Sequence, residues 1–419
     1  MTDFTPQPSC ATPEPVNTLR VEDAREKILQ QISAISCWRK VALRDALGQV
    51  LHEDVISPLS VPPHANSAMD GYAVRGEDLK HQLISLKRVG SAFAGKPFDK
   101  TVHTGECVRI MTGAMMPEGC DTVIMQEQAE VNNDLITLHG EHHSGENVRL
   151  AGEDIQTGAV VLTAGRRITS ADLGLLASLG FAELKVRRRI RVAFFSTGDE
   201  LRSLGETLNP GDIYDSNRYT LHAMLTRLDA EIIDMGVVTD NPDTLREALL
   251  QAAKEADVVI TSGGVSVGEA DYVKQLLDEL GEVHFWKIAM KPGRPLAYGK
   301  IADAHFFGLP GNPVSVMVTF YQFVQPALHK LAGAIYHAPM VLQAIAAENI
   351  RKRPGRFEFQ RGLLRSNSAN QLEVTMTGEQ GSGILHSMSH ANCFILLDED
   401  CDGVAAGQSV TVQPFAGLI

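Results

Sequence analysis

Apolar positions in the first half of the chain follow two different spacings, one typical of helices and one typical of strands. From about residue 18 to residue 55 they recur at helical spacing, and a second helical segment is predicted at Leu43–Leu51. From 58 to 151 they form short β-branched runs between glycine turns, which is typical of an all-β sandwich or barrel. Residues 153–188 return to mixed structure and end in a predicted helix near Ser170–Leu179.

From Arg189 onward, apolar runs of strand length alternate with amphipathic segments of helix length. The predicted strands are Arg191–Phe195, Glu231–Val238, Asp257–Thr261, Val283–Ala289, Leu296–Lys300 and His305–Leu309, and the predicted helices are Ser216–Leu228, Asp243–Ala256, Tyr272–Leu280 and Pro313–Leu331. This alternation predicts a doubly wound α/β sheet, in which ligands bind beyond the carboxyl ends of the strands. After Ala332 the pattern becomes β-rich again, with strands at Gln371–Thr375 and Cys393–Leu397.

The whole pattern predicts a multidomain α/β plus β protein, because 419 residues are too many for one ordinary core. A central α/β domain is joined by an N-terminal mixed domain, a β-rich insert and a C-terminal β-barrel domain. The predicted boundaries are 1–57 with 152–188, 58–151, 189–335 and 336–419, with residues 1–16 disordered.

Composition and charge narrow the range of functions. The formal net charge is −13, from 51 acidic residues and 38 lysines and arginines, which argues against binding to nucleic acid or to an anionic membrane surface. The six cysteines, at positions 10, 37, 107, 120, 393 and 401, show no zinc-site spacing. They are therefore expected to be reduced thiols in a cytoplasmic protein. The first residues lack the pattern of a signal peptide, and no apolar run is long enough to span a bilayer.

A glycine-rich turn follows the third strand of the predicted sheet. Its glycines are Gly263, Gly264 and Gly268, and a strand, a glycine turn and a helix start direct free main-chain N–H groups at an anion. The turn has neither the end of a P-loop nor the spacing of a dinucleotide fingerprint, and alone it also fits a plain strand-to-helix connection. Two acids within it, Glu269 and Asp271, favour a ligand site in which a cation or an amine-bearing ring accompanies the phosphate.

Acidic side chains follow three of the predicted parallel strands. Asp199 and Glu200 come after the first strand, Asp240 after the second, and Asp271 after the glycine turn. Since the carboxyl ends of parallel strands share one edge, these carboxylates are expected to converge. Asp215 or Asp271 alone is explained as a helix N-cap. The set favours a magnesium-assisted phosphate site, because Mg²⁺ prefers hard oxygen ligands and crowded carboxylates need a cation.

Two further loops on the same predicted edge supply positive charge and a helix start. Lys291 and Arg294 lie three positions apart in a proline-stiffened turn, and Gly293 allows close approach of the main chain. The two cations are suited to hold an oxyanion, and an exposed turn with solvated charges is the alternative. The segment Gly308–Pro313 then opens a helix, although a plain strand-to-helix turn also explains it.

Six segments of the chain carry recognisable motifs in a fixed order. They are Asn66–Val74, Arg109–Ala114, Phe195–Glu200, Thr261–Tyr272, Lys291–Pro295 and Gly308–Pro313. Together with the β-rich tail they resemble the molybdopterin molybdenumtransferase family, the group of bacterial MoeA and the gephyrin E domain. The resemblance covers the chain from about residue 18 to its end. It implies an elongated homodimer of four-domain subunits that transfers molybdate onto adenylated molybdopterin, with Mg²⁺ as cofactor and with release of AMP.

The resemblance also implies roles for individual residues. The implied catalytic residues are Asp70 and Thr112, contributed across the dimer, together with Glu200, Asp240, Asp271, Lys287 and Lys291. Of these, Glu200, Asp240 and Asp271 are the expected Mg²⁺ ligands. The expected cofactor-binding residues are Ser262, Gly263, Gly264, Ser266, Gly268, Glu269, Pro310, Gly311 and Pro313. The expected molybdate pocket consists of Lys291, Arg294, Pro295, Ser315, Arg361 and Ser382, and Arg149 and Asp154 fall on the interdomain segment.

Two other functions stay open at this point. One is adenylation of molybdopterin by ATP, which the N-terminal module with Asn66–Val74 argues against. The other is a non-catalytic molybdopterin carrier or scaffold, which the intact set of acids and lysines argues against. The adenylyltransferase and downstream molybdenum cofactor proteins are the expected protein partners.

Overall fold

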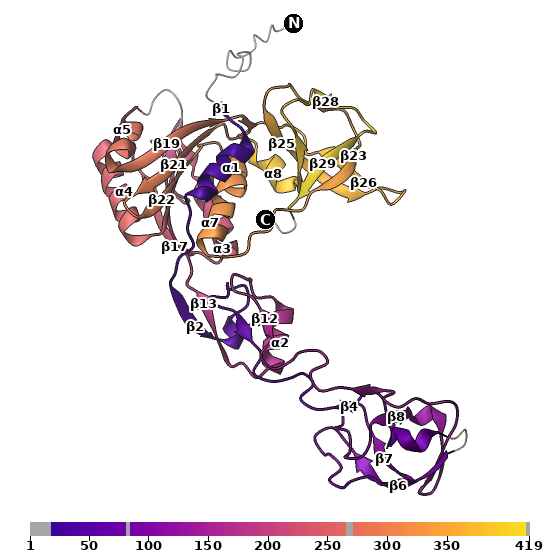
Figure 1. Ribbon diagram of the computed structural model, residues 1–419. Coiled ribbons are helices and arrows are strands. Elements are labelled where there is room, and N and C mark those ends of the chain that lie inside the picture. The colour runs from indigo at the N-terminus through magenta and orange to yellow at the C-terminus, as the bar shows by residue number, and fades with distance from the viewer. Residues whose placement is uncertain (1–17, 81–83, 265–270, 416–419) are drawn as a thin grey trace. The chain divides into compact units, whose positions relative to one another are not determined.

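A computed structural model describes residues 18–80, 84–264 and 271–415, without the side chains of residues 271–275 and Phe285. The described chain forms two compact units (Figure 1). Unit 1 contains residues 18–39, 48–50 and 186–415, and unit 2 contains residues 40–47 and 51–185. The predicted four-domain division is finer than this one, and its boundaries stay a prediction.

A seven-stranded sheet forms the centre of unit 1. Its order is β1-β19-β21-β22-β18-β14-β17. The strands are β1 (Thr18–Leu19), β14 (Arg191–Thr197), β17 (Glu231–Val238), β18 (Val258–Ser262), β19 (Gly281–Ile288), β21 (Pro295–Ile301) and β22 (Ala304–Leu309). β14, β17, β18 and β22 pair in parallel, as predicted, whereas β21 runs antiparallel to both β19 and β22. The sheet is therefore mixed, because the short loops around β21 leave no room for crossover helices.

Helices cover both faces of this sheet (Figure 1). α4 (Pro242–Glu255) and α5 (Asp271–Leu280) lie on one face, and the other face is covered by α1 (Val21–Gln30), α3 (Ser216–Arg227), α6 (Pro313–Thr319) and α7 (Gln325–Leu331). In α4 the buried residues Leu245, Ala248, Leu249 and Ala252 recur at helical spacing. The predicted doubly wound α/β domain is confirmed.

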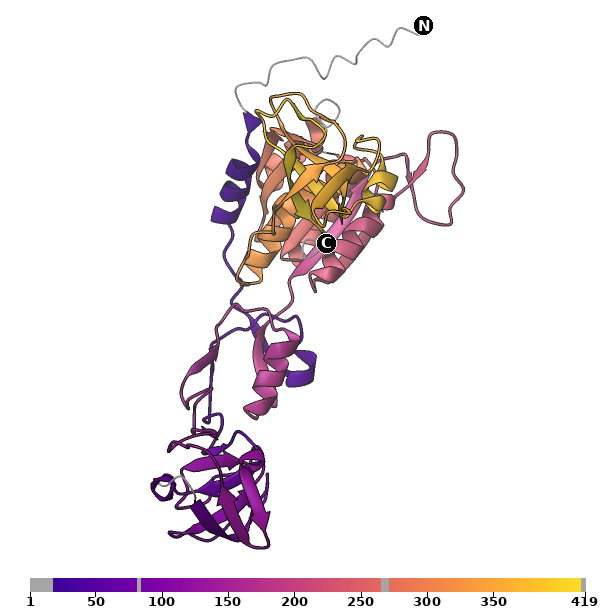
Figure 2. The ribbon, with the colours of Figure 1, turned by 90° about the vertical axis from the view of Figure 1, so that its right-hand side faces the viewer.

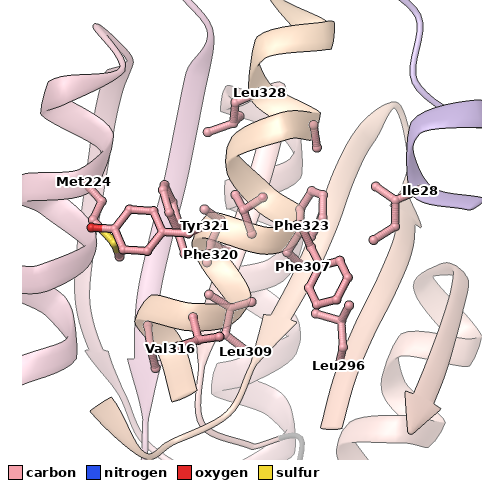
Figure 3. Close-up of a cluster of buried hydrophobic side chains, with 14 of the residues drawn as sticks. Ile28, Met224, Leu296, Phe307, Leu309, Val316, Phe320, Tyr321, Phe323 and Leu328 are labelled. Atoms are coloured by element: carbon pink, nitrogen blue, oxygen red, sulfur yellow. The ribbon is translucent and has the colours of Figure 1, made fainter. Parts of the chain in front are cut away.

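The larger apolar core of unit 1 lies under α1, α3, α6 and α7 (Figure 3). Phe307 and Leu309 of β22 meet Val316, Phe320 and Phe323 there, and each of these side chains is fully buried. The single helix predicted at Pro313–Leu331 is confirmed as one continuous run, with a π-helical segment at Phe320–Val324 between α6 and α7. This core holds the amino end of α6 against the carboxyl edge of the sheet.

The tail of the chain closes into a barrel (Figure 2, in yellow). Its strands are β20 (Met290–Lys291), β23 (Leu342–Ala346), β25 (Phe357–Ser366), β26 (Leu372–Met376), β27 (Cys393–Leu397) and β29 (Ser409–Pro414). Pairing of β25 with both β26 and β27 closes the sheet, which confirms the predicted β-barrel domain. The shorter elements of the tail are β24 (Ile350–Arg351), β28 (Gly403–Val404) and the helix α8 (Leu385–His390).

Unit 2 contains the predicted β-rich insert. Six of its strands form a sheet of order β8-β5-β7-β6-β10-β9, with a buried apolar cluster on each face. These strands are β5 (Gly71–Val74), β6 (Ile84–Ala92), β7 (Glu106–Ile110), β8 (Thr122–Met125), β9 (Ala129–Asn132) and β10 (Leu135–Leu138). The other elements in this part of the chain are β2 (Trp38–Ala42), β3 (Val55–Ile56), β4 (Asn66–Ser67), β11 (Val148–Arg149), β12 (Val160–Leu162), α2 (Ser170–Ser178) and β13 (Glu183–Arg187).

The helical pattern predicted from about residue 18 to residue 55 is confirmed only at α1. Trp38–Ala42 forms the strand β2 instead, and the helix predicted at Leu43–Leu51 is wrong. Only a short 3₁₀ turn, η2 (Leu43–Asp45), forms there, and Gly48 follows with a φ of 76°. The main-chain N–H groups of Leu43 and Leu51 bond to the carbonyls of Ala182 and Arg166 instead of to local partners. Residues far along the chain therefore supply hydrogen bonds that a helix would have made locally. Within the described part of the chain, no helix has the length and apolar character needed to cross a membrane.

Candidate functional site

The carboxyl ends of the parallel strands of unit 1 lie at one edge of the sheet. Ser262 of β18 is in register with Ser196 of β14 and with Leu309 of β22, and Thr197 of β14 is in register with Val238 of β17. The loops after these strands are the ones that the sequence singled out. The sheet therefore brings the acidic loops and the glycine loops to a common edge.

Three acids lie on the loops after β14 and β17. Glu200, Asp199 and Asp240 are exposed, and the Asp240 main-chain N–H donates to Asp199 Oδ1 at 3.4 Å. The Glu200 carboxylate folds back over Gly198, where an added Cβ would lie 2.6 Å from Glu200 Oε2. Asp271 begins α5, and its side chain is outside the described residues.

The described residues do not test the predicted Mg²⁺ ligand set, because the side chain of Asp271 lies outside them. No group of three His, Cys, Asp or Glu side chains among the described residues is arranged to hold a metal ion. The loops after β14 and β17 still carry hard oxygen donors, which suit Mg²⁺. The roles of Glu200, Asp240 and Asp271 stay predictions.

Two glycine loops face each other beside these acids. Gly263 has a φ of 92°, and an added Cβ would lie 2.5 Å from the carbonyl oxygen of Thr197, so only glycine fits this position. Its N–H donates to the carbonyl of Leu309 at 3.1 Å, and a Cβ on Gly311 would lie 3.8 Å from the Gly263 Cα. Gly264 continues the turn with a φ of 69°. The predicted ligands Ser266, Gly268 and Glu269 lie outside the described residues.

Four buried oxygen atoms at this edge have no hydrogen-bond partner among the described residues. They are Ser196 Oγ, Thr197 Oγ1, Asp215 Oδ2 and Asn217 Oδ1. Asp215 is 2% exposed, and its other carboxylate oxygen caps α3 by accepting the N–H of Arg218 at 3.1 Å. Because an unpaired buried oxygen costs stability, such a group points to a ligand or an ion that supplies the missing partner. Oxygen acceptors suit both a hard cation and a ligand that carries N–H groups.

The basic loop after β19 lies on the barrel side of the same unit. Lys291 pairs in β20 with Glu358 of β25, and its Nζ lies 3.5 Å from Glu358 Oε1. Glu358 is buried and also accepts a 2.9 Å hydrogen bond from Gln360 Nε2. The lysine side chain is half-exposed, so its charge is available at the surface. Lys287 is exposed on β19, where it is in register with Pro295.

The basic loop packs against α6, closest to Thr319 at the end of the helix. Gly293 has a φ of 97°, and an added Cβ would lie 2.7 Å from Thr319 Cγ2 and 3.6 Å from the carbonyl of Ser315. The Val314 N–H donates to the carbonyl of Ser382 at 3.0 Å, which ties the tail domain to the same helix. Pro310 and Ser315 are buried, and Pro313 is the first residue of the helix.

Arg361 supports this region from inside the barrel. Its side chain has no exposed surface, and burial lowers the pKa of its guanidinium to about 10. The guanidinium donates to the carbonyls of Glu379, Gln380 and Gly381 and to Ser387 Oγ, at 3.0–3.1 Å. It therefore organises the loop that leads into Ser382 and places a positive charge behind that loop. Direct contact of Arg361 with molybdate stays a prediction.

In unit 2 the structure brings Asp70 and Thr112 together. Asp70 Oδ1 accepts hydrogen bonds from the main-chain N–H and from the hydroxyl of Thr112, both at 2.7 Å. These two bonds hold the pKa of Asp70 below its ordinary value. Arg149 of β11 lies opposite Asn66 of β4, and Asp154 is exposed.

Several residues at the edge were not predicted as site residues. Ser196 and Thr197 stand in the same strand-end motif as Asp199 and Glu200, so their position at the end of a buried strand was a usable signal. Asn217 gave no signal beyond its place at a helix start. Glu358 gave none, because only the pairing of β20 with β25 brings it to Lys291.

Comparison with protein families matches nearly the whole chain in three consecutive parts. Residues 19–180 match the MoeA N-terminal region (domain I and II), residues 193–330 a probable molybdopterin binding domain, and residues 343–415 the MoeA C-terminal region (domain IV).

Curated relatives match the chain over almost its full length. A molybdopterin molybdenumtransferase of Haemophilus influenzae is 47% identical over 403 residues, covering 96% of this chain and 100% of the relative. A protein of the same name from Nostoc sp. is 36% identical over 421 residues, covering 98% and 94%. The crystal structure of a molybdopterin biosynthesis MoeA protein from Pyrococcus horikoshii OT3 matches with a TM-score of 0.84 and 30% identity, covering 95% of this chain and 100% of that chain.

Proposed function

Because this chain belongs to the MoeA family of molybdopterin molybdenumtransferases, we propose that it transfers molybdate onto adenylated molybdopterin and releases AMP, with Mg²⁺ as cofactor. One observation carries the proposal: oxygen ligands and glycine loops share the carboxyl edge of the central sheet, in the same unit as a basic loop that packs against α6. The oxygen ligands and the glycine loops suit an adenylated pterin. The basic loop suits a tetrahedral dianion such as molybdate.

On the basic side, the residues act by charge and by hydrogen bonding. Lys291 and Arg294 attract the molybdate dianion, and hydroxyls such as that of Ser315 orient its oxygens. The buried guanidinium of Arg361 adds positive potential behind the loop of Ser382. Glu358 keeps Lys291 in place between turnovers, since an exposed lysine would otherwise adopt many conformations.

On the acidic side, the residues hold the phosphate end of the substrate. The glycine loops at Gly263 and Gly311 allow its oxygens close to the main chain. Glu200, Asp240 and Asp271 are the residues that would hold Mg²⁺, which neutralises and polarises the pyrophosphate when bound. Most of the rate effect then comes from positioning and electrostatics.

The active assembly in this proposal is a homodimer. The Asp70–Thr112 pair is the contribution of a second copy to the site. The low pKa of Asp70 keeps its carboxylate charged at neutral pH, which is what a ligand to a cation or to an amine requires. The proposed protein partners are the adenylyltransferase that supplies the substrate and the proteins that receive the finished cofactor.

The test is AMP release from adenylated molybdopterin by the full chain. We expect release only when both Mg²⁺ and molybdate are present. Asp271→Ala or Lys291→Ala should lower the rate about 10²–10³-fold, as loss of a charge-stabilising group does. Lys300→Ala is the matched control, because Lys300 is an exposed lysine at the far end of β21 and should leave the rate unchanged.

Three other outcomes would contradict the proposal. ATP consumption with unadenylated molybdopterin would identify an adenylyltransferase. Tight binding of the pterin without AMP release would identify a carrier. A wild-type rate in Asp271→Ala or in Lys291→Ala would remove that residue from the site.

A further inference from the structure

Asn217 bridges the two glycine loops of the carboxyl edge. It is the second residue of α3 and is 9% exposed. Its side-chain Nδ2 donates to Ser262 Oγ at 2.8 Å and to the carbonyl of Gly311 at 2.7 Å. Ser262 leads directly into Gly263 and Gly264, and Gly311 stands at the start of α6. One amide therefore joins a loop from each of two neighbouring strands.

The orientation of this amide is determined by its partners. The carbonyl of Gly311 can only accept, so it requires the NH₂ side of the amide. Both amide hydrogens are then used, and Oδ1 is left buried without a partner among the described residues. If the amide were flipped, its Oδ1 would lie against the carbonyl oxygen of Gly311, and neither atom could donate a hydrogen bond.

Asn217 is not required to begin its helix. Asp215 is the N-cap of α3 and accepts the N–H of Arg218, which is the usual capping bond. The hydrogen bonds of the Asn217 side chain go to β18 and to the loop before α6. Their effect is therefore on the loops rather than on the helix.

The loops need such a bridge because of their composition. Gly263 and Gly264 adopt positive φ, and glycine loses more conformational freedom on ordering than any other residue. If ligand binding had to order both loops, the loss of conformational entropy would make the binding free energy less favourable and so weaken the affinity. We propose that Asn217 is a positioning residue, which pre-orders the Gly263 and Gly311 loops so that the phosphate end of the adenylated pterin meets a rigid cradle. The inference rests on the proposed function.

The test separates the two substrates kinetically. Asn217→Ala should raise the KM for adenylated molybdopterin about tenfold, as loss of one or two buried hydrogen bonds predicts, and should leave the KM for molybdate within twofold. Asn217→Asp keeps the shape but removes the donors, so it should be at least as damaging. Asn367→Ala is the matched control, since Asn367 also bridges main-chain groups but in the β25–β26 turn, where it accepts from Ala369 and Gln371. Both KM values should be unchanged in this control.

Each outcome decides for or against the inference. A KM for adenylated molybdopterin within twofold of wild type in Asn217→Ala would overturn it. An equal loss for both substrates, or an equal loss in Asn367→Ala, would also overturn it, because that is the signature of general destabilisation. If Asn217→Ala does not fold, Asn217→Asp decides alone: a raised KM for the pterin supports the bridge, and an unchanged KM overturns it. A wild-type protein without AMP release would instead refute the proposed function.

Discussion

Both edges of the central sheet carry buried carboxylates and other buried polar side chains, but the two edges differ in how these groups are hydrogen-bonded. At the amino edge, Asp257 accepts two hydrogen bonds from Arg188, at 2.6 and 2.8 Å, and one from the main-chain N–H of Arg191 at 2.8 Å. His305, at the start of β22, is buried, with Nδ1 3.4 Å from the hydroxyl of Tyr298. Both carboxylate oxygens of Asp257 are satisfied within the protein.

At the carboxyl edge several buried oxygen atoms have no partner among the described residues. Asp215 Oδ2, Ser196 Oγ and Asn217 Oδ1 are buried without a partner among the described residues. Polar atoms that are paired internally support the fold, and polar atoms that are left unpaired are available to a ligand. Among the described residues, the pairing of buried oxygen atoms, rather than residue type, distinguishes the structural edge from the candidate site, although Arg191 Nε at the amino edge is also buried without a partner. Changes at the amino edge should therefore alter stability, and changes at the carboxyl edge should alter activity.

The largest expected effect is on stability, at the amino edge. Burial raises the pKa of Asp257, but the hydrogen bonds from Arg188 and Arg191 outweigh it and hold the pKa below its ordinary value. Asp257→Ala should lower the free energy of unfolding of unit 1 by about 3 kcal/mol, because it leaves two arginines without their partner. Urea titration followed by tryptophan fluorescence measures this, since Trp38 and Trp286 both belong to unit 1.

The matched control for this change is Glu279→Ala. Glu279 pairs with Arg246 at 2.5 Å, but both side chains are largely exposed, so the expected loss is below about 1 kcal/mol. Well below the melting temperature, the AMP-release rate of Asp257→Ala should equal that of the wild type. A large loss of activity with little loss of stability would contradict the assignment of this edge to structure.

The next effect is a pH dependence of stability, from His305. Burial, with a smaller effect of Lys300, lowers the pKa of His305 to about 4. Between pH 6.5 and pH 4 the unfolded chain therefore binds a proton that the folded chain does not. The stability from neutral His305 is complete above pH 6.5 and is lost as the pH falls toward 4, by about 3 kcal/mol in all.

His305→Gln tests this prediction because it cannot be protonated in that range. The difference in unfolding free energy between wild type and variant should change by about 2 kcal/mol from pH 7 to pH 4.5. Urea titrations at the two pH values measure it. Parallel pH profiles for the two proteins would show that His305 does not titrate as its burial requires.

The smallest expected effect is at the carboxyl edge, from Asp215. Asp215→Asn keeps the cap on α3 and removes a buried charge, so stability should stay within about 1 kcal/mol of wild type. The AMP-release rate should fall about tenfold, because the lost carboxylate oxygen is one that a cation or an N–H group would use. Full activity combined with reduced stability would show that Asp215 has a structural role, like Asp257 at the amino edge. The assignment of activity to the carboxyl edge would then be contradicted.

Local patterns in the sequence predicted most of the fold. Strand-length apolar runs at Arg191–Phe195 and Cys393–Leu397 and helical spacing in α4 were sufficient, because strand and helix periods are properties of consecutive residues. The exceptions lie between residues 31 and 55, where helical spacing was expected: Trp38–Ala42 is a strand, and the segment Leu43–Leu51 forms no α-helix. Its main-chain groups bond to residues more than a hundred positions away, and no local pattern encodes such partners.

The candidate site also combines features that the sequence predicted with features that only the folded chain creates. The sequence by itself determined which loops follow the parallel strands, and therefore that Glu200, Asp240 and Gly263 belong to one edge of the sheet. Only the tertiary structure decided which polar atoms at that edge find partners: Lys291 meets Glu358 across β20 and β25, Arg361 is enclosed by carbonyls, and Asn217 joins two loops. The physical reason is that periodicity depends on neighbours along the chain, whereas hydrogen-bond pairing depends on which distant segments folding brings into contact.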